Sequence, residues 1–170
     1  MDNPRIILRP LQLADKSVLA SLANNKNVSD KLRDYFPHPY SEQDAESFIN
    51  LTKNESPQQS FGIVYNGQLC GVIGLIIQRD VYRLSGEVGY WIGEPFWGKG
   101  IATAAVQQIT DYGFDKLNLT RVFAGVFEFN TASMRVLEKN GFENEAVFKQ
   151  AVFKNGKIWN EHRYCKINGI

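Results

Sequence analysis

Apolar residues recur along the 170-residue chain at two spacings, one typical of strands and one typical of helices. Short apolar runs bounded by turn residues predict seven strands, at Arg5–Arg9, Phe61–Tyr65, Leu69–Ile77, Gly86–Ile92, Val122–Phe129, Phe148–Phe153 and Ile158–Ile167. Apolar positions three and four residues apart predict helices at Leu13–Asn24, from Ser41 onward, from Gly100 to about Lys116, and at Asn130–Lys139. This order predicts an α/β protein with a mixed sheet and helices on both of its faces.

Asparagine–glycine pairs mark three of the boundaries between these elements. Asn66-Gly67 and Asn155-Gly156 each separate two strand-like runs, so both predict hairpins. Asn140-Gly141 ends the last helix and leaves Phe142 positioned for a C-terminal hydrophobic contact. In the first helix, the predicted apolar face holds Leu13, Val18, Leu19 and Leu22.

Composition narrows the class of protein. With 44% hydrophobic and 22% charged residues, the chain has globular proportions, and we expect one domain over residues 1–170. A net charge of +1 argues against nucleic acid or an anionic membrane as partner. Cys70 and Cys165 lie outside any CxxC spacing, so neither zinc nor a disulfide framework is predicted. The N-terminal residues resemble no secretory signal and no apolar run is long enough to span a membrane, so we expect a cytoplasmic protein.

The segment from Gly86 to Thr103, GEVGYWIGEPFWGKGIAT, is where the sequence indicates chemistry. A strand leads into a glycine-containing loop that opens directly onto a long helix, an arrangement that favours phosphate binding by backbone amides. The known phosphate loops fit poorly, because Gly100 is followed by Ile101 rather than by lysine. An ordinary structural turn is the plainer interpretation of these glycines.

The run from Trp97 to Ala102 (WGKGIA) resembles the pyrophosphate loop of the GNAT superfamily of acyl-CoA-dependent N-acetyltransferases, whose pattern is Q/R-x-x-G-x-G/A. Gly100 matches the central glycine and Ala102 the last position, whereas Trp97 replaces Gln or Arg. A tryptophan here is typical of the ribosomal-protein alanine acetyltransferase branch. The segments ILRPL, PYSEQDAESFI and NTASMRVLEKNGF resemble that branch as well, so the likeness covers nearly the whole chain.

The resemblance implies a single-domain fold, a mostly antiparallel sheet of about seven strands with a central splayed parallel pair. It implies acetyl-CoA as the acyl donor and no metal. The implied cofactor-binding residues lie in one strand end, the loop and helix that follow it, and one later helix cap: Tyr90, Trp91, Ile92, Gly98, Lys99, Gly100, Ile101, Ala102, Thr103 and Asn130. The plainer alternatives are that Tyr90 and Trp91 are core residues and that Asn130 is only a helix cap.

Two residues are candidates for proton transfer. Glu87 lies in a strand expected to be central, where a carboxylate is a candidate general base; a structural role with hydrogen bonds to neighbours is the alternative. Ser133 follows Asn130 by one helical turn, and the resemblance implies a position near the CoA sulfur, where a hydroxyl can protonate the thiolate. A solvated helix serine is the alternative.

The acceptor is expected to be a primary amine, either a protein or peptide N-terminus or a small molecule. Tyr35, Phe36 and Tyr40 are candidate substrate contacts, with core packing as the alternative. Their loop carries mixed charge, which argues against a polyamine. His38 and His162 are expected to be surface or packing residues, and Cys70 an inert buried thiol. We expect a monomer or homodimer. The competing functions are a non-catalytic acyl-CoA sensor and a nucleotide-phosphate-binding protein.

Overall fold

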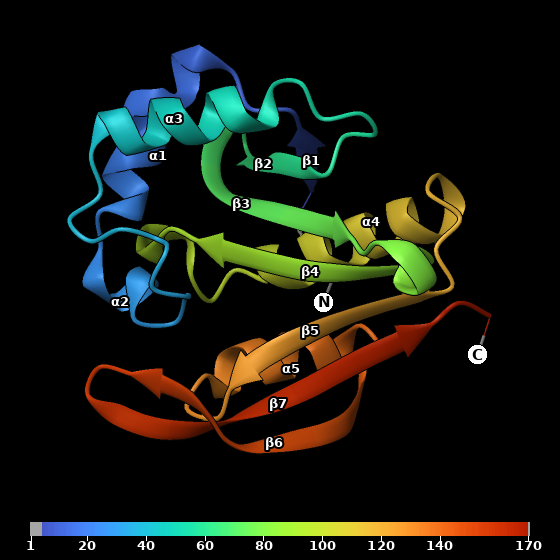
Figure 1. Ribbon diagram of the computed structural model, residues 1–170. Coiled ribbons are helices and arrows are strands. Elements are labelled where there is room, and N and C mark those ends of the chain that lie inside the picture. The colour runs from blue at the N-terminus through green and yellow to red at the C-terminus, as the bar shows by residue number, and fades with distance from the viewer. Residues whose placement is uncertain (1–4, 170) are drawn as a thin grey trace. The chain divides into compact units, whose positions relative to one another are not determined.

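The structure, a computed structural model, describes residues 5–169. Seven strands form one sheet in the order β1-β2-β3-β4-β5-β7-β6 (Figure 1). Their bounds are β1 Ile6–Arg9, β2 Ser60–Tyr65, β3 Gln68–Ile77, β4 Ser85–Ile92, β5 Arg121–Phe127, β6 Glu143–Lys154 and β7 Lys157–Ile167. Strands β4 and β5 pair in parallel, whereas β1–β2, β2–β3, β5–β7 and β6–β7 are antiparallel. The predicted mixed sheet of about seven strands is confirmed.

Five α-helices occur within residues 5–169: α1 Lys16–Ala23, α2 Lys26–Ser29, α3 Glu42–Thr52, α4 Ile101–Asp115 and α5 Thr131–Lys139. Three short 3₁₀ turns accompany them, η1 Leu13–Asp15, η2 Asp80–Tyr82 and η3 Glu94–Phe96. Of the helices, α2 lies in a stretch where apolar periodicity predicted none, because four residues are too few to show a period. Strand β6 is twice as long as predicted, since its polar first half carries no apolar signal.

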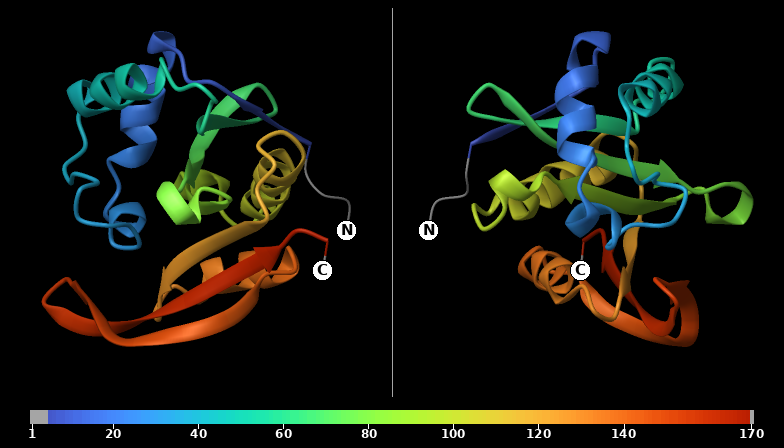
Figure 2. Two further views of the ribbon diagram at one scale, coloured as in Figure 1. Left: turned by 45° about the vertical axis from the view of Figure 1, so that its right-hand side comes forward. Right: turned by 90° about the vertical axis from the view of Figure 1, so that its left-hand side faces the viewer.

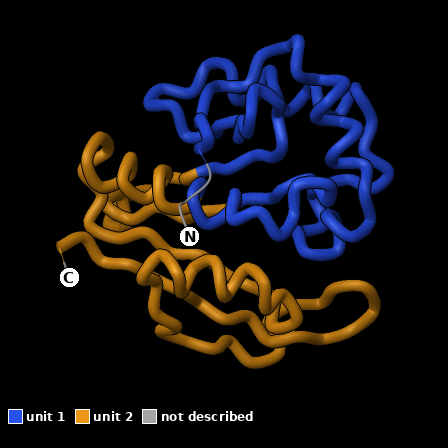
Figure 3. Tube along the Cα trace, turned by 180° about the vertical axis from the view of Figure 1, so that it is seen from behind, with its two compact units in different colours: residues 1–74, 90–105 blue, residues 75–89, 106–170 orange. Residues whose placement is uncertain are grey.

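The chain divides into two compact units (Figure 3). Unit 1 comprises residues 1–74 and 90–105, and unit 2 comprises residues 75–89 and 106–170. Unit 1 therefore contains the end of β4 and the loop that opens onto α4. Unit 2 contains the first part of β4, where it pairs with β5, together with helix α5 and the hairpin β6–β7.

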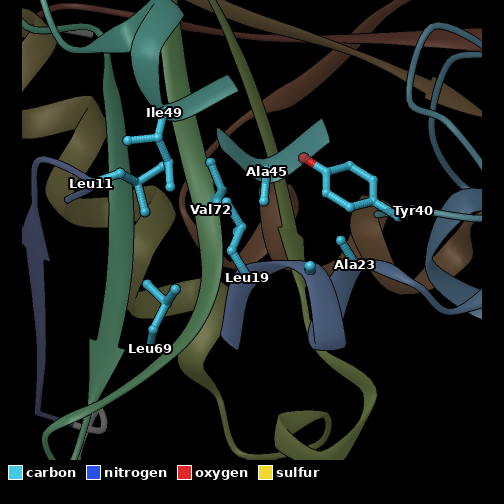
Figure 4. Packing of buried hydrophobic residues seen from close by; sticks show 9 residues of the cluster. Leu11, Leu19, Ala23, Tyr40, Ala45, Ile49, Leu69 and Val72 are labelled. Atoms are coloured by element: carbon cyan, nitrogen blue, oxygen red, sulfur yellow. The ribbon is translucent and has the colours of Figure 1, made fainter. Parts of the chain in front are cut away.

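The core of unit 1 lies between α1, α3 and β3 (Figure 4). Leu19 of α1 and Ile49 of α3 are almost fully buried, and they belong to the same cluster as Val72 of β3. The prediction for the first helix was wrong for Leu13 and Val18, which are 51% and 48% exposed. Leu13 belongs to the 3₁₀ turn η1, whose three-residue period takes it out of line with the buried face of α1.

Two glycine features hold the sheet of unit 1 in register. Asn66 and Gly67, at φ 49° and 79°, form the predicted hairpin turn between β2 and β3. At Gly71 of β3 a Cβ atom would lie 2.3 Å from the Trp91 carbonyl oxygen of β4. Only glycine allows this close approach of the two backbones, and it fixes the end of β4 on which Trp91 lies.

In unit 2, β4 and β5 pair over Ser85–Glu87, with Glu87 opposite Phe123. Helix α5 lies against one side of β5 and β7 (Figures 1 and 2). It ends as predicted: Gly141 has φ 77°, and the Phe142 N–H donates to the Leu137 carbonyl oxygen at 3.1 Å. Phe142 is buried, as the predicted C-terminal hydrophobic contact requires.

Candidate active site

The loop before α4 has the backbone that a phosphate site needs. Gly98 and Gly100 both have φ 74°, a conformation that favours glycine. Helix α4 begins at Ile101, and the Ala104 N–H donates to the Gly100 carbonyl oxygen at 3.1 Å. The N–H groups of the first helical turn lie before this first intrahelical bond, and such groups bind acceptors from outside the helix. No heavy atom lies within 4 Å of a Cβ built on Gly98, so the loop has room for a ligand.

Trp97, which replaces Gln or Arg of the GNAT pattern, makes two contacts, one through its indole N–H and one through the face of its ring. Its Nε1–H donates to the Ile92 carbonyl oxygen at 2.7 Å, which ties the loop to the end of β4. The Lys31 ammonium lies 4.1 Å from the centroid of its ring, within the range of a cation–π contact. Sequence reasoning missed Lys31, because the contact joins residues 66 positions apart and no local pattern marks it.

Glu94 joins the same loop to α2. Asn25 and Asn27 both donate to its carboxylate from their side-chain amides. These hydrogen bonds, from Asn25 first and Asn27 second, hold the pKa of the Glu94 carboxyl below its usual value, and Lys31 contributes in the same direction. Asn25 also caps α2, accepting from the Asn27 N–H at 2.8 Å. The capping preference of asparagine is a local signal by which this helix could have been predicted.

The predicted residues at the end of β4 lie beside the predicted substrate loop. Trp91 is partly buried against the core, and its ring meets Phe36 edge-on at 5.8 Å. Phe36 in turn packs against Tyr40 at 4.9 Å. Tyr40 is itself a core residue, and burial, followed by the nearby Asp44 charge, raises the pKa of its hydroxyl to about 12. Tyr35 is 80% exposed.

The remaining cofactor residues of unit 1 surround the start of α4. Ile92 and Ile101 are buried, whereas Ala102 and Thr103 are partly exposed. Lys99 is exposed, and its ammonium lies 5.3 Å from the centroid of the Phe96 ring. The side chain of Lys99 is thus available to an anion bound at the loop.

The three predicted residues of unit 2 lie on β4 and at the start of α5. Glu87 is half-buried in β4. Asn130 is the N-cap of α5, and its side-chain oxygen accepts from the Ser133 N–H at 3.4 Å. The capping interpretation of Asn130 is therefore confirmed for its oxygen, which leaves its amide hydrogens as donors. Ser133 is half-buried in the first turn of α5.

Cys70 and the two histidines lie where the plainer interpretations put them. Cys70 is fully buried, and burial raises the pKa of its thiol to about 11, so the reactive thiolate is disfavoured. His38 is exposed, and the Nδ1 of His162 bonds the Asn144 side chain. Within residues 5–169, no group of three or more His, Cys, Asp or Glu side chains is placed to hold a metal ion. No helix in the same range is long and apolar enough to cross a membrane.

Comparisons with known proteins identify the family of the chain. Residues 5–143 match the acetyltransferase (GNAT) domain family. YnaD of Bacillus subtilis, an uncharacterised N-acetyltransferase, is 30% identical over 166 residues, which cover 95% of this chain and 92% of that protein. The spermidine N(1)-acetyltransferase of Escherichia coli K12 is also 30% identical, over 93% of this chain and 83% of that enzyme.

The fold agrees with a solved structure in which coenzyme A is present. RimL, a ribosomal L7/L12 α-N-protein acetyltransferase, has a TM-score of 0.84 over 95% of this chain and 93% of that one, at 21% identity. This likeness shows the fold, and the family match and the two relatives show the membership. The chain therefore belongs to the GNAT family and is an acetyl-CoA-dependent N-acetyltransferase.

Proposed function

We propose that the protein transfers the acetyl group of acetyl-CoA to a primary amine by direct attack, with both substrates bound at once. The acceptor is a protein or peptide N-terminus or a small-molecule amine. The observation that carries the proposal is the loop before α4, where two glycines at φ 74° precede a 15-residue helix. A helix N-terminus of this kind favours a bound pyrophosphate through its N–H groups and its dipole.

In this proposal residues of both units contribute to binding acetyl-CoA. The amides of residues 98–103 bind the pyrophosphate, and Lys99 adds a cation. The backbone of Tyr90, Trp91 and Ile92 bonds the pantetheine arm and the thioester oxygen, and the amide hydrogens of Asn130 donate to the same arm. The fit is supported by the open space at Gly98 and by the exposed Lys99 side chain. The whole of residues 1–170 acts as one N-acetyltransferase domain.

Glu87 and Ser133 move the protons of the proposed reaction. Glu87 takes a proton from the acceptor ammonium, directly or through a water, and frees the nitrogen lone pair. The nitrogen then bonds the acetyl carbon, and the bond from that carbon to the CoA sulfur breaks. Ser133 donates its hydroxyl proton to the sulfur and regains a proton, through water, from the nitrogen, which loses its second proton as the amide forms. The products are the N-acetylated amine and CoA thiol, and no acyl-enzyme forms.

The acceptor classes named here have support among the relatives. RimL acts on a protein N-terminus, and the Escherichia coli relative acts on spermidine. We propose that this chain takes an amine of one of these general kinds, and that it works as a monomer or a homodimer.

A screen of CoA thiol release tests the proposal. The parent protein is incubated with acetyl-CoA and, separately, with peptides, amino acid amides, alkylamines and spermidine. We expect thiol release that depends on both enzyme and acceptor, with an initial-rate pattern of intersecting lines. Tight binding of acetyl-CoA without release for any amine would contradict the proposal and identify a non-catalytic acyl-CoA-binding protein.

A further inference from the structure

Gly125 in the middle of β5 makes room for a carboxylate from the neighbouring strand. A Cβ atom at Gly125 would lie 2.8 Å from both the carboxyl carbon and the Oε1 of Glu161 in β7. The Glu161 carboxylate therefore lies directly over the backbone of β5, and its side chain is only 15% exposed. A charged group held this close to a strand needs a reason, because desolvation of a carboxylate is costly.

Arg163 fixes this carboxylate from two residues further along β7. Its Nη2 donates to Glu161 Oε1 at 2.9 Å. The guanidinium carbon lies 4.9 Å from the ring centroids of both Phe123 and Phe148, so aromatic faces hold the group in place. Its Nε–H is buried and, among the described residues, has no hydrogen-bond acceptor. The guanidinium is thus fixed, and a quarter of the Arg163 side chain remains exposed, so its outer donors can be reached by a ligand.

The Glu161–Arg163 pair shares a face of the sheet with Glu87. Glu87 lies opposite Phe123, and Gly125 lies opposite Arg163, so these residues point to the same side of their strands. The alternate residue Val122 points the other way, where a Cβ at Gly113 of α4 would contact it at 3.6 Å. Tyr164, the next residue after Arg163 and therefore on the other face of β7, donates to Glu138 of α5 at 2.9 Å, so α5 covers that other face.

We propose that Glu161 binds the acceptor amine and that Arg163 binds the carbonyl oxygen next to it, so that the acceptor is a peptide or protein N-terminus. This inference rests on the proposed function, of which it narrows the substrate class. The ammonium of the acceptor donates to Glu161 before Glu87 deprotonates it. The first carbonyl of the peptide accepts from the Arg163 guanidinium. Because Gly125 has no side chain, the Glu161 carboxylate can lie against the backbone of β5.

The chemistry of the pair disfavours a polyamine. A polyamine carries ammonium groups and no hydrogen-bond acceptor, so it leaves the Arg163 donors unsatisfied. Its second positive charge would also lie close to the guanidinium, and such like-charge contacts are a common source of specificity. A peptide N-terminus offers one donor group and one acceptor group to match the carboxylate and the guanidinium.

The test compares three acceptors with the parent protein and three variants. The acceptors are an alanyl peptide, an alkylamine of similar size without a carbonyl, and spermidine. Glu161→Gln should raise the KM for the peptide about 10–100-fold, the range expected for a lost charge-assisted hydrogen bond, with acetyl-CoA affinity within twofold of the parent. Arg163→Lys should abolish the preference for the peptide over the alkylamine.

Gly125→Ala gives an independent variant that keeps every charge. The added Cβ displaces the end of the flexible Glu161 side chain and no backbone atom, so the protein should fold, and the KM for the peptide should rise. The matched control is Glu46→Gln, which likewise removes one carboxylate from an ion pair, that with Lys16 between α3 and α1. This control should leave the KM for every acceptor within twofold of the parent.

Two results would overturn the inference while the proposed function stands. One is a parent enzyme that acetylates spermidine more efficiently than the peptide. The other is a Glu161→Gln variant that folds, binds acetyl-CoA and keeps the parent KM for the peptide. Failure of the parent to acetylate any amine would instead refute the proposed function itself, so the two failures are distinguishable.

Discussion

At the scale of single residues, the proposed reaction depends on two side chains of unit 2 with different tasks. Glu87, half-buried in the parallel pair, acts on the amine before the new bond forms. Ser133, at the start of α5, acts on sulfur when the old bond breaks. Because the two residues serve successive events, a substitution at each tests one event separately.

Replacing Glu87 with glutamine keeps the size of the side chain and removes the proposed base. We expect the rate of acetylation to fall roughly 10²–10⁴-fold at neutral pH, the usual contribution of general base catalysis. Acetyl-CoA affinity should stay close to that of the parent. The measurement is kcat/KM across pH, with Glu143→Gln, an exposed residue of β6, as control. Parent activity in Glu87→Gln would remove this residue from the mechanism.

Replacing Ser133 with alanine removes only the hydroxyl. The N–H that bonds the Asn130 cap belongs to the backbone and remains, so stability should change by less than about 0.5 kcal/mol. Since the hydroxyl is needed only as charge grows on sulfur, kcat and kcat/KM should fall together. Acetyl-CoA binding should stay within a few-fold of the parent. An unchanged kcat, under conditions where chemistry limits turnover, would contradict the general-acid role.

At the scale of elements, two glycines in similar backbone conformations allow the role of the loop before α4 to be tested apart from backbone strain. Gly98 in this loop and Gly67 in the hairpin turn have φ 74° and 79°, and no heavy atom lies within 4 Å of a Cβ at either position. An alanine at each should therefore cost a similar amount, about 1–2 kcal/mol, from backbone strain alone.

The prediction is that Gly98→Ala weakens acetyl-CoA binding and Gly67→Ala does not. The two variants should unfold at similar denaturant concentrations, which controls for strain. Titration of acetyl-CoA followed by calorimetry gives the two affinities. Equal affinities in both variants would mean that the backbone of the loop does not contact the pyrophosphate.

An ion pair between β1 and the turn before α1 should make the stability of the protein depend on pH. Arg9 donates twice to the Asp15 carboxylate at 2.8 Å, and the Gln12 N–H donates to it at the same distance. The Arg9 hydrogen bonds chiefly hold the pKa of Asp15 below its usual value, against the opposing effect of burial. A carboxyl whose pKa is lowered on folding stabilises the protein above its unfolded pKa of about 3.9, and this stabilisation is lost as the pH falls through the folded pKa.

Asp15→Asn should accordingly lower the free energy of unfolding by about 1.5–3 kcal/mol at neutral pH. The difference from the parent should shrink below pH about 4, as Asp15 itself becomes protonated. Chemical denaturation at several pH values measures this difference in the free energy of unfolding. The control is Asp111→Asn, at an exposed residue. A difference that persists unchanged at pH 2 would show that packing, and not charge, accounts for the role of Asp15.

The same scale shows what the sequence can predict. Hairpins at Asn66 and Asn155, the cap at Asn130 and the end of α5 rest on local backbone preferences, and the structure confirms them. Strand β6 and helix α2 were missed in part or whole, because their polar residues gain order from pairing or from contacts distant in the sequence. The hydrogen bonds of Glu94 and the cation–π contact of Lys31 belong to this second kind.

At the scale of the whole molecule, acetyl-CoA should stabilise the native state. A ligand that binds only the folded protein adds RT ln(1 + [L]/Kd), or about 2.7 kcal/mol at 100 times Kd. Thermal unfolding with acetyl-CoA, ATP and NAD should show a rise in Tm for the first, with much smaller effects from the others, which lack a pantetheine arm. An equal rise with ATP would indicate a general nucleotide site.

The fold and the family could be predicted from a few segments of the sequence, whereas the residues that act through tertiary contacts could not. Glu161 and Arg163 illustrate the limit. Their pairing is local, but the space above Gly125 and the contacts with Phe123 and Phe148 exist only once β5, β6 and β7 are side by side. No periodicity in a single strand reports such a cross-strand arrangement.

The central claim is direct transfer of an acetyl group from acetyl-CoA to an amine, and a single-turnover experiment with isotopically labelled acetyl-CoA tests it. Enzyme in excess over labelled acetyl-CoA is mixed with a peptide acceptor, and the peptide and the protein are both analysed by mass spectrometry. The account predicts that the label appears on the peptide N-terminus, with one CoA thiol released for each acetyl transferred and none on the protein. Label on a protein side chain before it reaches the peptide, or none on the peptide at all, would contradict it.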